Sequence, residues 1–374
     1  MKCKLEEICL FRMGKTDVAN LTIETYISTE NMLPDKSGIV NATSLPSVDL
    51  TQAYEKGDVL VSNIRPYFKK IWKAKSNGGC SNDVLVFTAK ENTDSDFLYY
   101  VLADDAFFSY AMATSKGTKM PRGDKKSIMQ YEVPCYDIET QQKIASILKS
   151  IDEKIELNNA INNNLLQQAQ TLYKDCFVDM RPFDGDMPTD WHLGTVSEII
   201  ELHDSKRIPL SSRERADLAK IYPYYGATSV MDYVDRYLFD GIYLLLGEDG
   251  TVVDSKGFPI LQYVEGKFWV NNHAHIITGK NGFTVETLYL LFSLTNVRSI
   301  VTGAVQPKIS QANLNKVPVI IPSEAELSTF DSIIQPIFAQ IRNLRTENDR
   351  LAATRDTLLP RLMSGELNVS DLDL

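Results

Sequence analysis

Residues 117–128 read GTKMPRGDKKSI, and residues 303–314 read GAVQPKISQANL. The two stretches share residue types at one offset, 303 minus 117 or 186 positions, in a chain of 374 residues. The matching pairs are Gly117 and Gly303, Pro121 and Pro307, Arg122 and Lys308, and Ile128 and Leu314. A match repeated at one offset predicts an internal duplication, in which one fold occurs twice along the chain.

The duplication continues in the residues after each stretch. Residues 137–177 align without a gap with residues 323–363, and apolar residues recur in both at alternating steps of four and three. Such spacing, sustained over several heptads, predicts two long helices that pair as a coiled coil. The same spacing places Leu172 in the first seam. The main residues predicted to pair are Ile144, Leu148, Ile151, Ile155 and Leu165 in the first helix and Phe330, Ile334, Ile337, Ile341, Leu344 and Leu351 in the second.

Local signals mark the ends of these helices. Asp137 and Ser323 occupy equivalent N-cap positions, and Ser323 with Glu326 forms a capping box. The first helix is expected to stop before Pro182, because proline disfavours helical geometry in the preceding residue. Pro336 lies inside the second helix, where its missing backbone donor is expected to bend the axis.

Polar residues interrupt both seams near their middles. They are Asn158 and Asn162 in the first helix and Asn348 and Arg355 in the second. Buried seam asparagines can fix the register and orientation of a helix pair. A solvated middle that frays is the alternative.

The segments outside the helices have mixed character. Residues 57–64, 83–89, 241–251 and 274–279 are β-like runs bounded by turn residues. A weaker match, at an offset of 271 minus 81 or 190 positions, pairs residues 81–90 with residues 271–280, and a helical stretch follows each copy. Each globule is therefore predicted to have the same fold, with diverged surface loops.

The predicted fold class is α+β, with two mixed α/β globules separated by a pair of long antiparallel coiled-coil helices in a pseudo-twofold internal repeat. The helices run antiparallel because the first leads from globule one to globule two and the second must return. The predicted domains are globules 1–136 and 182–322, a central helical region 137–181, a C-terminal helical region 323–365 and a tail 366–374.

Composition narrows the class of protein. Hydrophobic residues make up 44% and charged residues 24%, which is ordinary for a globular protein. No apolar run is long enough to span a bilayer and no signal peptide is evident, so we expect a soluble, cytoplasmic protein. The net charge of −10 argues against a general nucleic-acid binder, but residues 68–75 and 116–126 are locally basic. Two solvated loops are the alternative interpretation of these clusters.

Cysteine and histidine give little support for a metal site. The five cysteines are scattered without a Cys-x-x-Cys pair, so we expect reduced thiols rather than disulfides or zinc ligands. His273 and His275 would lie on one face of a strand, but no Cys, Asp or Glu stands beside them at ligand spacing. We therefore predict no bound metal.

The symmetry of the chain suggests what it binds. Two related but diverged globules joined by long helices suit a target with twofold character whose halves differ in detail. Duplex DNA fits, because a twofold protein naturally addresses two inverted half-sites.

At this point the chain resembles a known family over its full length, the specificity subunit of type I restriction–modification enzymes. The motifs that carry the resemblance are GTKMPRG and GAVQPKIS running into the helices, QQKIASILKSIDEKIELNNAIN, LYKDCFVDMRPFDGDMPTDWHLG and LLPRLMSGEL. The resemblance implies two target-recognition domains that read a bipartite, asymmetric DNA site, and helical regions that recruit two methyltransferase subunits. It also implies no catalysis in this chain. S-adenosylmethionine, ATP and Mg²⁺ would belong to the methyltransferase and restriction or translocase subunits, and this chain would carry no cofactor.

DNA contacts can be predicted only by region. Phosphates call for Lys and Arg, and base edges for Arg, Asn, Gln or Ser on loops. Tyr224 and Tyr225 could equally be core aromatics, whereas Gly226 would let the backbone approach DNA closely. The predicted contact residues are Ser62, Asn63, Arg65, Tyr67, Lys69, Lys70, Lys119 and Arg122 in the first globule and Tyr224, Tyr225, Gly226, Thr228, Ser229, Gln306 and Lys308 in the second.

Two other classes of function are weighed. A coiled-coil adaptor that binds only protein is disfavoured by the basic loops. A Mg²⁺-dependent nuclease would use Asp254, Glu265 and Lys267, a pattern that arises often by chance. The absence of a phosphate loop and of a glycine-rich loop for a methyl donor agrees with a chain that is not an enzyme.

Overall fold

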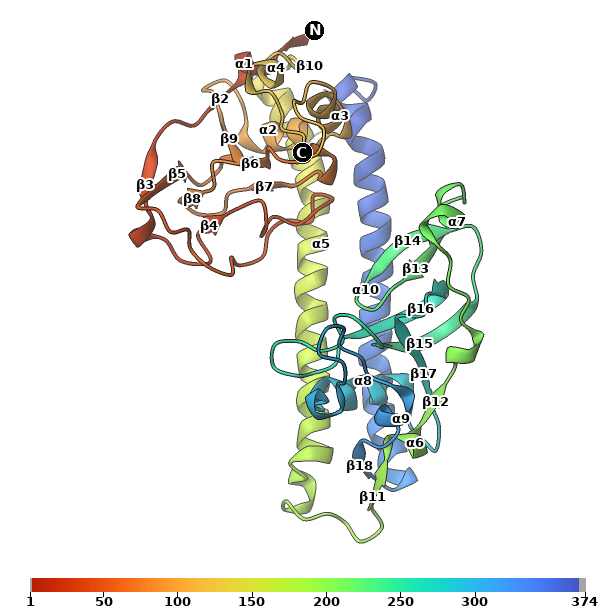
Figure 1. The fold of residues 1–374 in the computed structure, drawn as a ribbon. Helices are drawn as coiled ribbons and strands as arrows, with labels where there is room; N and C mark the ends of the chain where they lie inside the picture. The colour runs from red at the N-terminus through yellow and green to blue at the C-terminus, as the bar shows by residue number, and fades with distance from the viewer. Residues whose placement is uncertain (1, 370–374) are drawn as a thin grey trace. The chain divides into compact units, whose positions relative to one another are not determined.

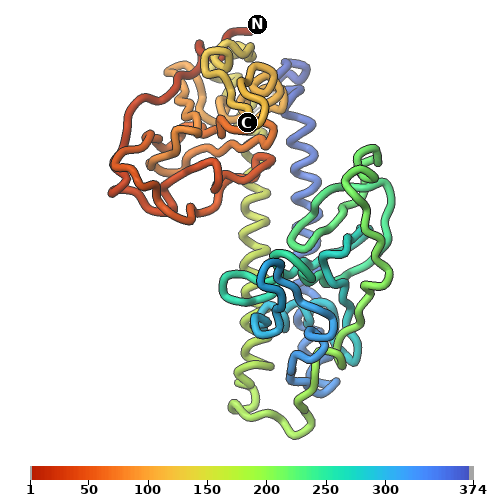
Figure 2. Tube along the Cα trace, viewed as in Figure 1, coloured from red at the N-terminus to blue at the C-terminus, as the bar shows by residue number. Residues whose placement is uncertain are grey.

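The computed structural model describes residues 2–369 and separates the chain into two compact units. The first unit comprises Met1–Leu157 and Glu347–Leu374, and the second comprises Asn158–Thr346. Both ends of the described chain therefore belong to the first unit (Figure 2). The last five residues of the predicted tail, 370–374, lie outside the described residues.

The described part of the first unit contains short strands, four short helices and parts of both long helices (Figure 1). Its strands are β1 (Lys2–Lys4), β2 (Cys9–Phe11), β3 (Lys15–Asp17), β4 (Tyr26–Ile27), β5 (Leu50–Tyr54), β6 (Val59–Ser62), β7 (Ile71–Lys73), β8 (Gly78–Cys80), β9 (Val84–Ala89) and β10 (Glu132–Pro134). Its helices are α1 (Leu5–Ile8), α2 (Ser95–Ala103), α3 (Asp105–Ala113), α4 (Lys125–Met129) and the start of α5 (Ile138–Tyr173), with 3₁₀ turns η1 (Val18–Asn20) and η2 (Pro66–Phe68).

The second unit has longer strands. These are β11 (His192–Thr195), β12 (Ile200–Leu202), β13 (Tyr222–Tyr225), β14 (Val230–Val234), β15 (Phe239–Gly247), β16 (Leu261–Val270), β17 (Ala274–Gly279) and β18 (Pro318–Ile321). Its helical segments are α6 (Val196–Ile199), α7 (Ser212–Ala216), α8 (Val285–Leu294), α9 (Gln311–Leu314) and the start of α10 (Glu324–Ser364), with short turns η3 (Lys174–Val178), η4 (Arg181–Phe183), η5 (Asp204–Lys206) and η6 (Arg298–Ile300).

Sheet topology confirms the duplication. The strand order β2-β9-β6-β7 of the first unit recurs in the second as β12-β17-β15-β16, which β13 and β14 extend. In each unit the opening strand pairs with the strand just before the long helix, β1 with β10 and β11 with β18. The first unit adds a separate sheet of order β3-β5-β8-β4. The α+β fold with two related globules is therefore correct.

The β-like runs of the sequence form the central strands. Residues 83–89 and 274–279, which match at offset 190, become β9 and β17, and a helix follows each. The first of these helical stretches is divided, because Asp104 ends α2 and its carboxylate accepts a hydrogen bond from Ala106 N at the start of α3. Burial of alternate and consecutive apolar residues along β9 and β17 forms the core under each helix.

The two long helices begin and end close to the predicted residues. Asp137 caps α5, since its carboxylate accepts a 2.8 Å hydrogen bond from Thr140 N. The α-helical part ends at Tyr173 and continues as a π turn to Val178, before Pro182. α10 continues without interruption across Pro336, whose side chain is exposed.

Core packing within each unit shows that the helices run antiparallel. In the first unit, Ile144 and Leu148 from the start of α5 share a core with Leu359 and Leu362 from the end of α10. In the second unit, Ala169 and Tyr173 from the end of α5 share a core with residues from the start of α10, Phe330, Ile334 and Ile341. Leu344 is buried and Leu165, Ile337, Ile151, Ile155 and Leu351 are half-buried.

The seam drifts away from the predicted positions as the helix proceeds. Leu172 was expected in the seam, but it is 36% exposed, whereas Tyr173 is 5% exposed and packs in the core. An α-helix drifts by about 20° per heptad relative to a strict seven-residue repeat. Four heptads from Ile144 the accumulated drift approaches the 100° between neighbouring residues, so the buried position moves by one residue.

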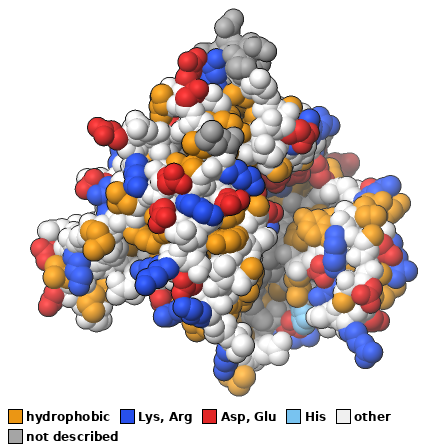
Figure 3. Space-filling view, turned by 90° about the horizontal axis from the view of Figure 1, so that it is seen from above, with side chains coloured by type: hydrophobic (Ala, Val, Ile, Leu, Met, Phe, Trp, Pro, Cys, Tyr) orange, Lys and Arg blue, Asp and Glu red, His pale blue; other side chains and the backbone are white. Residues whose placement is uncertain are grey.

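The surface charge and the cysteines agree with an ordinary globular protein. On the face seen in Figure 3, Lys and Arg side chains are interspersed with Asp and Glu. All five cysteines are free, as expected for reduced thiols. Between residues 2 and 369, no helix has the length and apolarity needed to cross a membrane.

Candidate nucleic-acid interface

The two stretches that revealed the duplication form the same structure in both units, which we call the proline hairpins (residues 116–122 and 302–308). Lys116 and Arg122 exchange backbone hydrogen bonds of 2.9 and 3.0 Å, and Thr302 and Lys308 exchange bonds of 2.9 and 2.7 Å. Each turn begins with a glycine of positive φ, +91° at Gly117 and +87° at Gly303. A side chain at Gly303 would also collide with the carbonyl oxygen of Gln306, so this position requires glycine.

Each proline hairpin is bonded to the loop that follows a central strand. After β6, Arg65 N donates to Pro121 O at 2.8 Å, and Gly123 N donates to Asn63 O at 3.2 Å. After β15, Gly250 N donates to Pro307 O at 2.9 Å, and Ile309 N donates to Glu248 O at 2.8 Å. Residues 63–65 and 248–250 therefore occupy equivalent places, and a hairpin with its loop forms one surface element in each unit.

In the first unit this element and the adjoining η2 bring several of the predicted contact residues together. Arg65 is exposed on a left-handed backbone of φ 50°, directly before η2. Tyr67 and Phe68 in η2 are 49% and 38% exposed, with ring centroids 4.6 Å apart. Lys119 at the hairpin tip is also exposed. The side chains combine positive charge with aromatic surface, which suits contact with nucleic acid.

Other predicted residues of the first unit are tied to neighbours. Arg122 pairs with Asp83 at 3.1 Å, and Lys69 pairs with Asp105 at 2.8 Å. Lys70 Nζ donates to Thr29 O at 2.6 Å, and partial burial lowers the pKa of this lysine.

Ser62 requires a correction. It is only 4% exposed, and its hydroxyl donates to Ile64 O at 3.1 Å. It shapes the loop from inside rather than facing a ligand.

In the second unit the prediction around residues 224–229 needs larger corrections. Tyr224 is 1% exposed and lies against the Arg215 guanidinium, 4.6 Å from its ring centroid, so it is a core aromatic. Gly226 is buried, and the side chain of Met231, not a ligand, fills the space that a Cβ would need. Tyr225 is half-buried against Phe268, and the exposed members are Thr228 and Ser229.

The loop that sequence reasoning missed is residues 248–250. It carries Glu248 and Asp249 at the places that Asn63 and Ile64 hold in the first unit. The signal was available, because these residues follow a long apolar strand just as residues 63–65 do. Lys308 pairs with Glu248 at 3.2 Å, while Gln306 is exposed at the hairpin tip.

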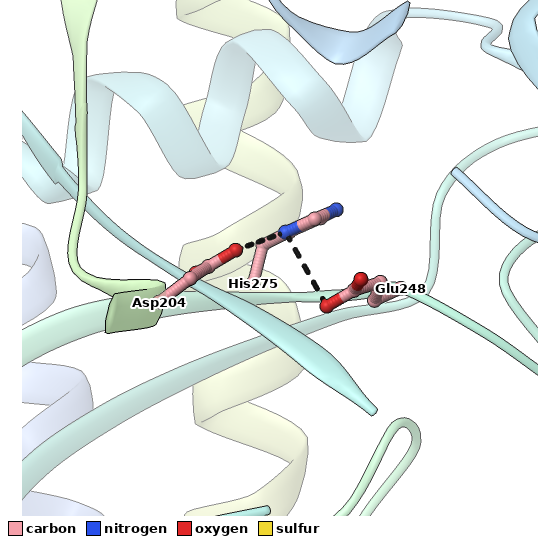
Figure 4. Close-up of side chains that lie close together, drawn as sticks. All are labelled: Asp204, Glu248 and His275. Carbon is pink, nitrogen blue, oxygen red and sulfur yellow. Dashed lines mark hydrogen bonds and ion pairs between the residues drawn. The ribbon is translucent and has the colours of Figure 1, made fainter. Parts of the chain in front are cut away.

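A buried charged network anchors the second proline hairpin (Figure 4). His275 is 0% exposed, with Nδ1 2.6 Å from Asp204 Oδ2 and Nε2 2.8 Å from the carbonyl oxygen of Ile309. Glu248 lies 3.8 Å from His275 Nδ1 and accepts a 2.5 Å bond from Arg207. Both imidazole nitrogens lie within hydrogen-bond distance of an oxygen atom, so the ring joins the hairpin to the sheet.

The carboxylates of this network are held in the charged form. Burial alone would raise the pKa of Asp204, but bonds from His275, Ile276 N and Gln311 hold it below its ordinary value. Burial likewise acts to raise the pKa of Glu248, and the bond from Arg207 and the charge of His275 outweigh it.

The three side chains of this network are also of types that can bind a metal ion. Ligand atoms of Asp204, Glu248 and His275 lie within 4.8 Å of one another. Arg207 and Lys308 already balance both carboxylates, and both nitrogens of His275 are engaged. The arrangement is that of an ion-pair network. His273 was expected on the same strand face as His275, but it precedes β17 and pairs with Asp249.

The residues weighed for a nuclease have separate structural roles. The Asp254 carboxylate accepts bonds from the backbone N–H groups of residues 256–258, which closes a turn. Glu265 pairs with Arg342 of α10 at 3.2 Å, and Lys267 lies over the Tyr237 ring at 4.7 Å from its centroid. Each of the three is thus used in local structure, which removes the support for a catalytic cation site there.

Comparison with known proteins assigns the chain to a family. The family model described as "Type I restriction modification DNA specificity domain" matches residues 1–167 and 188–353, one match for each copy. The chain belongs to this family. It is therefore a specificity subunit that recognises DNA with two domains, as the sequence resemblance indicated, and not the catalytic component of the enzyme.

Individual proteins similar to this chain are specificity subunits of the same kind of enzyme. The type I restriction enzyme MjaIX specificity subunit of Methanocaldococcus jannaschii is 25% identical over 348 residues, covering 85% of this chain and 79% of the relative. The HindI specificity subunit of Haemophilus influenzae is 24% identical over 431 residues, covering 91% and 94%. The crystal structure of the S subunit from M. genitalium matches with a TM-score of 0.54 at 17% identity, over 97% of this chain and 96% of that one, which shows a shared fold.

Proposed function

We propose that each unit reads one half of a bipartite, asymmetric DNA site through its proline hairpin and the loop bonded to it. The observation that carries the proposal is that both units build this element with equivalent backbone bonds, 65 to 121 and 250 to 307, while its side chains differ. Because the backbone of the element is the same in both units, the two units can dock on a duplex in the same way. Because the side chains differ, the two half-sites can differ in sequence.

The hairpin elements of the two units carry different charges. Arg65, Lys119 and Arg122 are exposed in the first unit and are suited to phosphates. In the second unit Lys308 is the basic member and Gln306 the polar one, beside the acidic loop 248–250. We infer that the two half-sites are held with different numbers of phosphate contacts.

The helices are proposed to recruit two methyltransferase subunits, which would in turn bring restriction or translocase subunits. Within residues 138–173 and 324–364, which the structure describes in full, five large apolar side chains remain exposed. They are Ile138 at 43%, Leu157 at 55%, Ile161 at 37% and Leu172 at 36% on α5, and Ile333 at 50% on α10. Exposed apolar residues on otherwise polar helices are typical of surfaces that bind protein. S-adenosylmethionine, ATP and Mg²⁺ would be bound by those partners, and a DNA target places the action in the cytoplasm.

Selection of bound DNA tests the proposal. The chain is assembled with its methyltransferase subunits, and bound duplexes are recovered from a random pool and sequenced. We expect two short conserved blocks of different sequence, separated by an unconserved spacer. A single block, or no enrichment, would contradict bipartite reading and favour the adaptor that binds only protein.

A further inference from the structure

The two units differ most in the length of one loop. It follows β4 in the first unit and β13 in the second, and each of these strands pairs in parallel with a neighbouring strand. In the second unit β13 ends at Tyr225 and β14 begins at Val230, so four residues, 226–229, join them. In the first unit β4 ends at Ile27 and β5 begins at Leu50, so residues 28–49, which number 22, lie between strands. Irregular loops above about 12–15 residues are uncommon and are usually functional. We call residues 28–46 the insertion loop.

The insertion loop is firmly built despite its length. Asn31 is 4% exposed, and its amide donates to Tyr26 O at 3.1 Å and to Val40 O at 2.9 Å, while its oxygen accepts from Ser28 N at 2.6 Å. Ala42 is buried among apolar residues, and its N–H donates to Ile23 O at 2.8 Å. These anchors hold the loop in one shape before any ligand arrives.

A cleft of about 380 Å³ lies between the insertion loop and residues 81–83. Because Ala42 turns inward, Asn41 and Thr43 flank it on the exposed side, followed by Ser44. These three side chains line the cleft, and none of them hydrogen-bonds another residue within the described range 2–369. Their donors and acceptors are therefore free for a ligand.

The cleft adjoins the first hairpin element. Asp83 lines the cleft and pairs with Arg122 of the hairpin at 3.1 Å. Asn63 N donates to Asp83 O at 2.8 Å, and Lys70 reaches Thr29 O from the other side. A duplex held by Arg65, Lys119 and Arg122 would thus lie next to the cleft.

The chemistry of the lining identifies the part of DNA that fits. The described lining residues offer hydroxyls, one free amide at Asn41 and the carboxylates of Glu30 and Asp83, and no Lys or Arg is among them. Phosphates need cationic partners, whereas base edges present paired donors and acceptors that Asn, Ser and Thr can match. A negatively charged backbone is therefore disfavoured here.

We propose that this cleft receives the base edges of the half-site read by the first unit, and that Asn41, Thr43 and Ser44 are specificity-determining residues. The inference rests on the proposed DNA-binding function and adds to it the element that reads sequence. It also explains how one fold reads two sequences, since the second unit has only residues 226–229 at this place.

The test uses the chain assembled with its methyltransferase subunits and DNA selection from a random pool. Asn41→Ala with Thr43→Ala is compared with wild type and with Asn92→Ala plus Ser47→Ala, which alters exposed residues outside the cleft lining. We expect preference to fall about tenfold at one or two positions of a single half-site, with the other half-site and the spacer retained. Asn41→Asp, which replaces an amide donor by an acceptor, should change the preferred base rather than merely weaken it.

The outcomes separate the two proposals. If wild type selects two blocks and the Asn41 and Thr43 variants select them unchanged, the cleft does not read bases although the proposed function stands. Equal weakening of both half-sites would also overturn the inference, because it indicates general damage. If wild type itself enriches no sequence, the proposed function fails first.

Discussion

At the scale of single residues, the proposed DNA contacts depend on the side chains that hold the proline hairpins in place as well as on those that would touch DNA. His275 donates to the backbone of Ile309 at the base of the second hairpin, and Asp204 holds the ring from its other side. The same carboxylate accepts from Ile276 N at 2.9 Å. Asp204 is therefore joined to β17 through two bonds, and it fixes the imidazole ring that bonds to Ile309.

Acidification should loosen this connection. The folded-state pKa of Asp204 lies below its unfolded value, so its contribution to stability is present above about pH 4 and is lost as pH falls through the lowered folded value. Asp204→Asn removes the titration and should cost about 1–3 kcal/mol near pH 6. The gap between wild type and variant should shrink at pH 3.5.

Denaturant unfolding would measure that gap. Trp191 and Trp269 report on the second unit in a Trp72→Phe background, since these are the three tryptophans of the chain. A gap of equal size at pH 6 and pH 3.5 would show that the Asp204 carboxylate is not the titrating group.

A second prediction concerns the exposed cations. Replacing Lys119, Arg122 and Lys308 together by alanine should weaken DNA binding by the assembled complex and reduce its salt slope. The reduction should reach about 0.9 for each phosphate contact that is lost. Lys15, Lys56 and Lys316, replaced together, give the same change in net charge on exposed positions elsewhere. Identical affinity and slope in both triple variants would remove the hairpins from the DNA interface.

At the scale of elements, helix geometry decides which residues are buried. The four-three spacing locates both helices, but it assumes a strict seven-residue period, which a straight helix does not keep. Phe338 and Tyr173 are buried at 1% and 5%, one position after the predicted Ile337 and Leu172. In α10 the predicted positions Ile341 and Leu344, which follow Ile337, are buried at 3% and 6%, so the offset there is local.

Neighbouring isoleucines of α10 offer a direct test of this packing. Ile334 is 0% exposed in the second-unit core, whereas Ile333 is 50% exposed. Ile334→Asp buries an unpaired charge and should cost more than about 3 kcal/mol, while Ile333→Asp should change stability by about 0.5 kcal/mol or less. Thermal melting measures both, and similar melting temperatures for the two variants would refute the assigned seam.

Ile333→Asp has a second use. Because it spares the fold, weaker recruitment of methyltransferase by this variant would map a partner surface on the exposed face of α10. Full recruitment would leave the exposed apolar positions of α5 as the next candidates, beginning with Leu157, which is the most exposed of them at 55%.

The interface was harder to predict from sequence than the fold. The repeat, the central strands and the helix caps depend on local patterns, which the sequence carries directly. Residues 248–250 lie beside the second hairpin because of backbone hydrogen bonds between segments about 60 residues apart. Such bonds do not depend on side-chain type, so the sequence does not reveal them. Tyr224 illustrates the same difficulty, since its contacts with Arg215 and with the backbone of Leu210, which make it a core tyrosine, depend on the tertiary fold.

At the scale of the whole molecule, the chain passes between its units only within the two long helices. The boundaries fall after Leu157 in α5 and after Thr346 in α10. One heptad inserted at both boundaries keeps the seam in phase and adds about 10 Å to each helix. We expect the preferred spacer to lengthen by about three base pairs, with both half-site sequences retained.

Some affinity should also be lost, because three base pairs turn the duplex by roughly a third of a revolution. Selection from a random pool would show the new spacer. Retention of the original spacer, or a change of half-sites without a change of spacer, would mean that the helices do not set the distance between them. A variant with the heptad in α5 alone provides the mismatched control.

The division of the chain also orders events on the ribosome. The second unit is one continuous segment, Asn158–Thr346, and its residues have all been synthesised before the chain is finished. The first unit begins the chain yet needs Leu359, Leu362, Met363 and Val369 to complete its core. The first unit is translated first, but its apolar core therefore stays partly exposed until residues 359–369 have been synthesised. A product that ended before Leu359 would lack these side chains, and the apolar core of its first unit would stay open to aggregation and proteolysis.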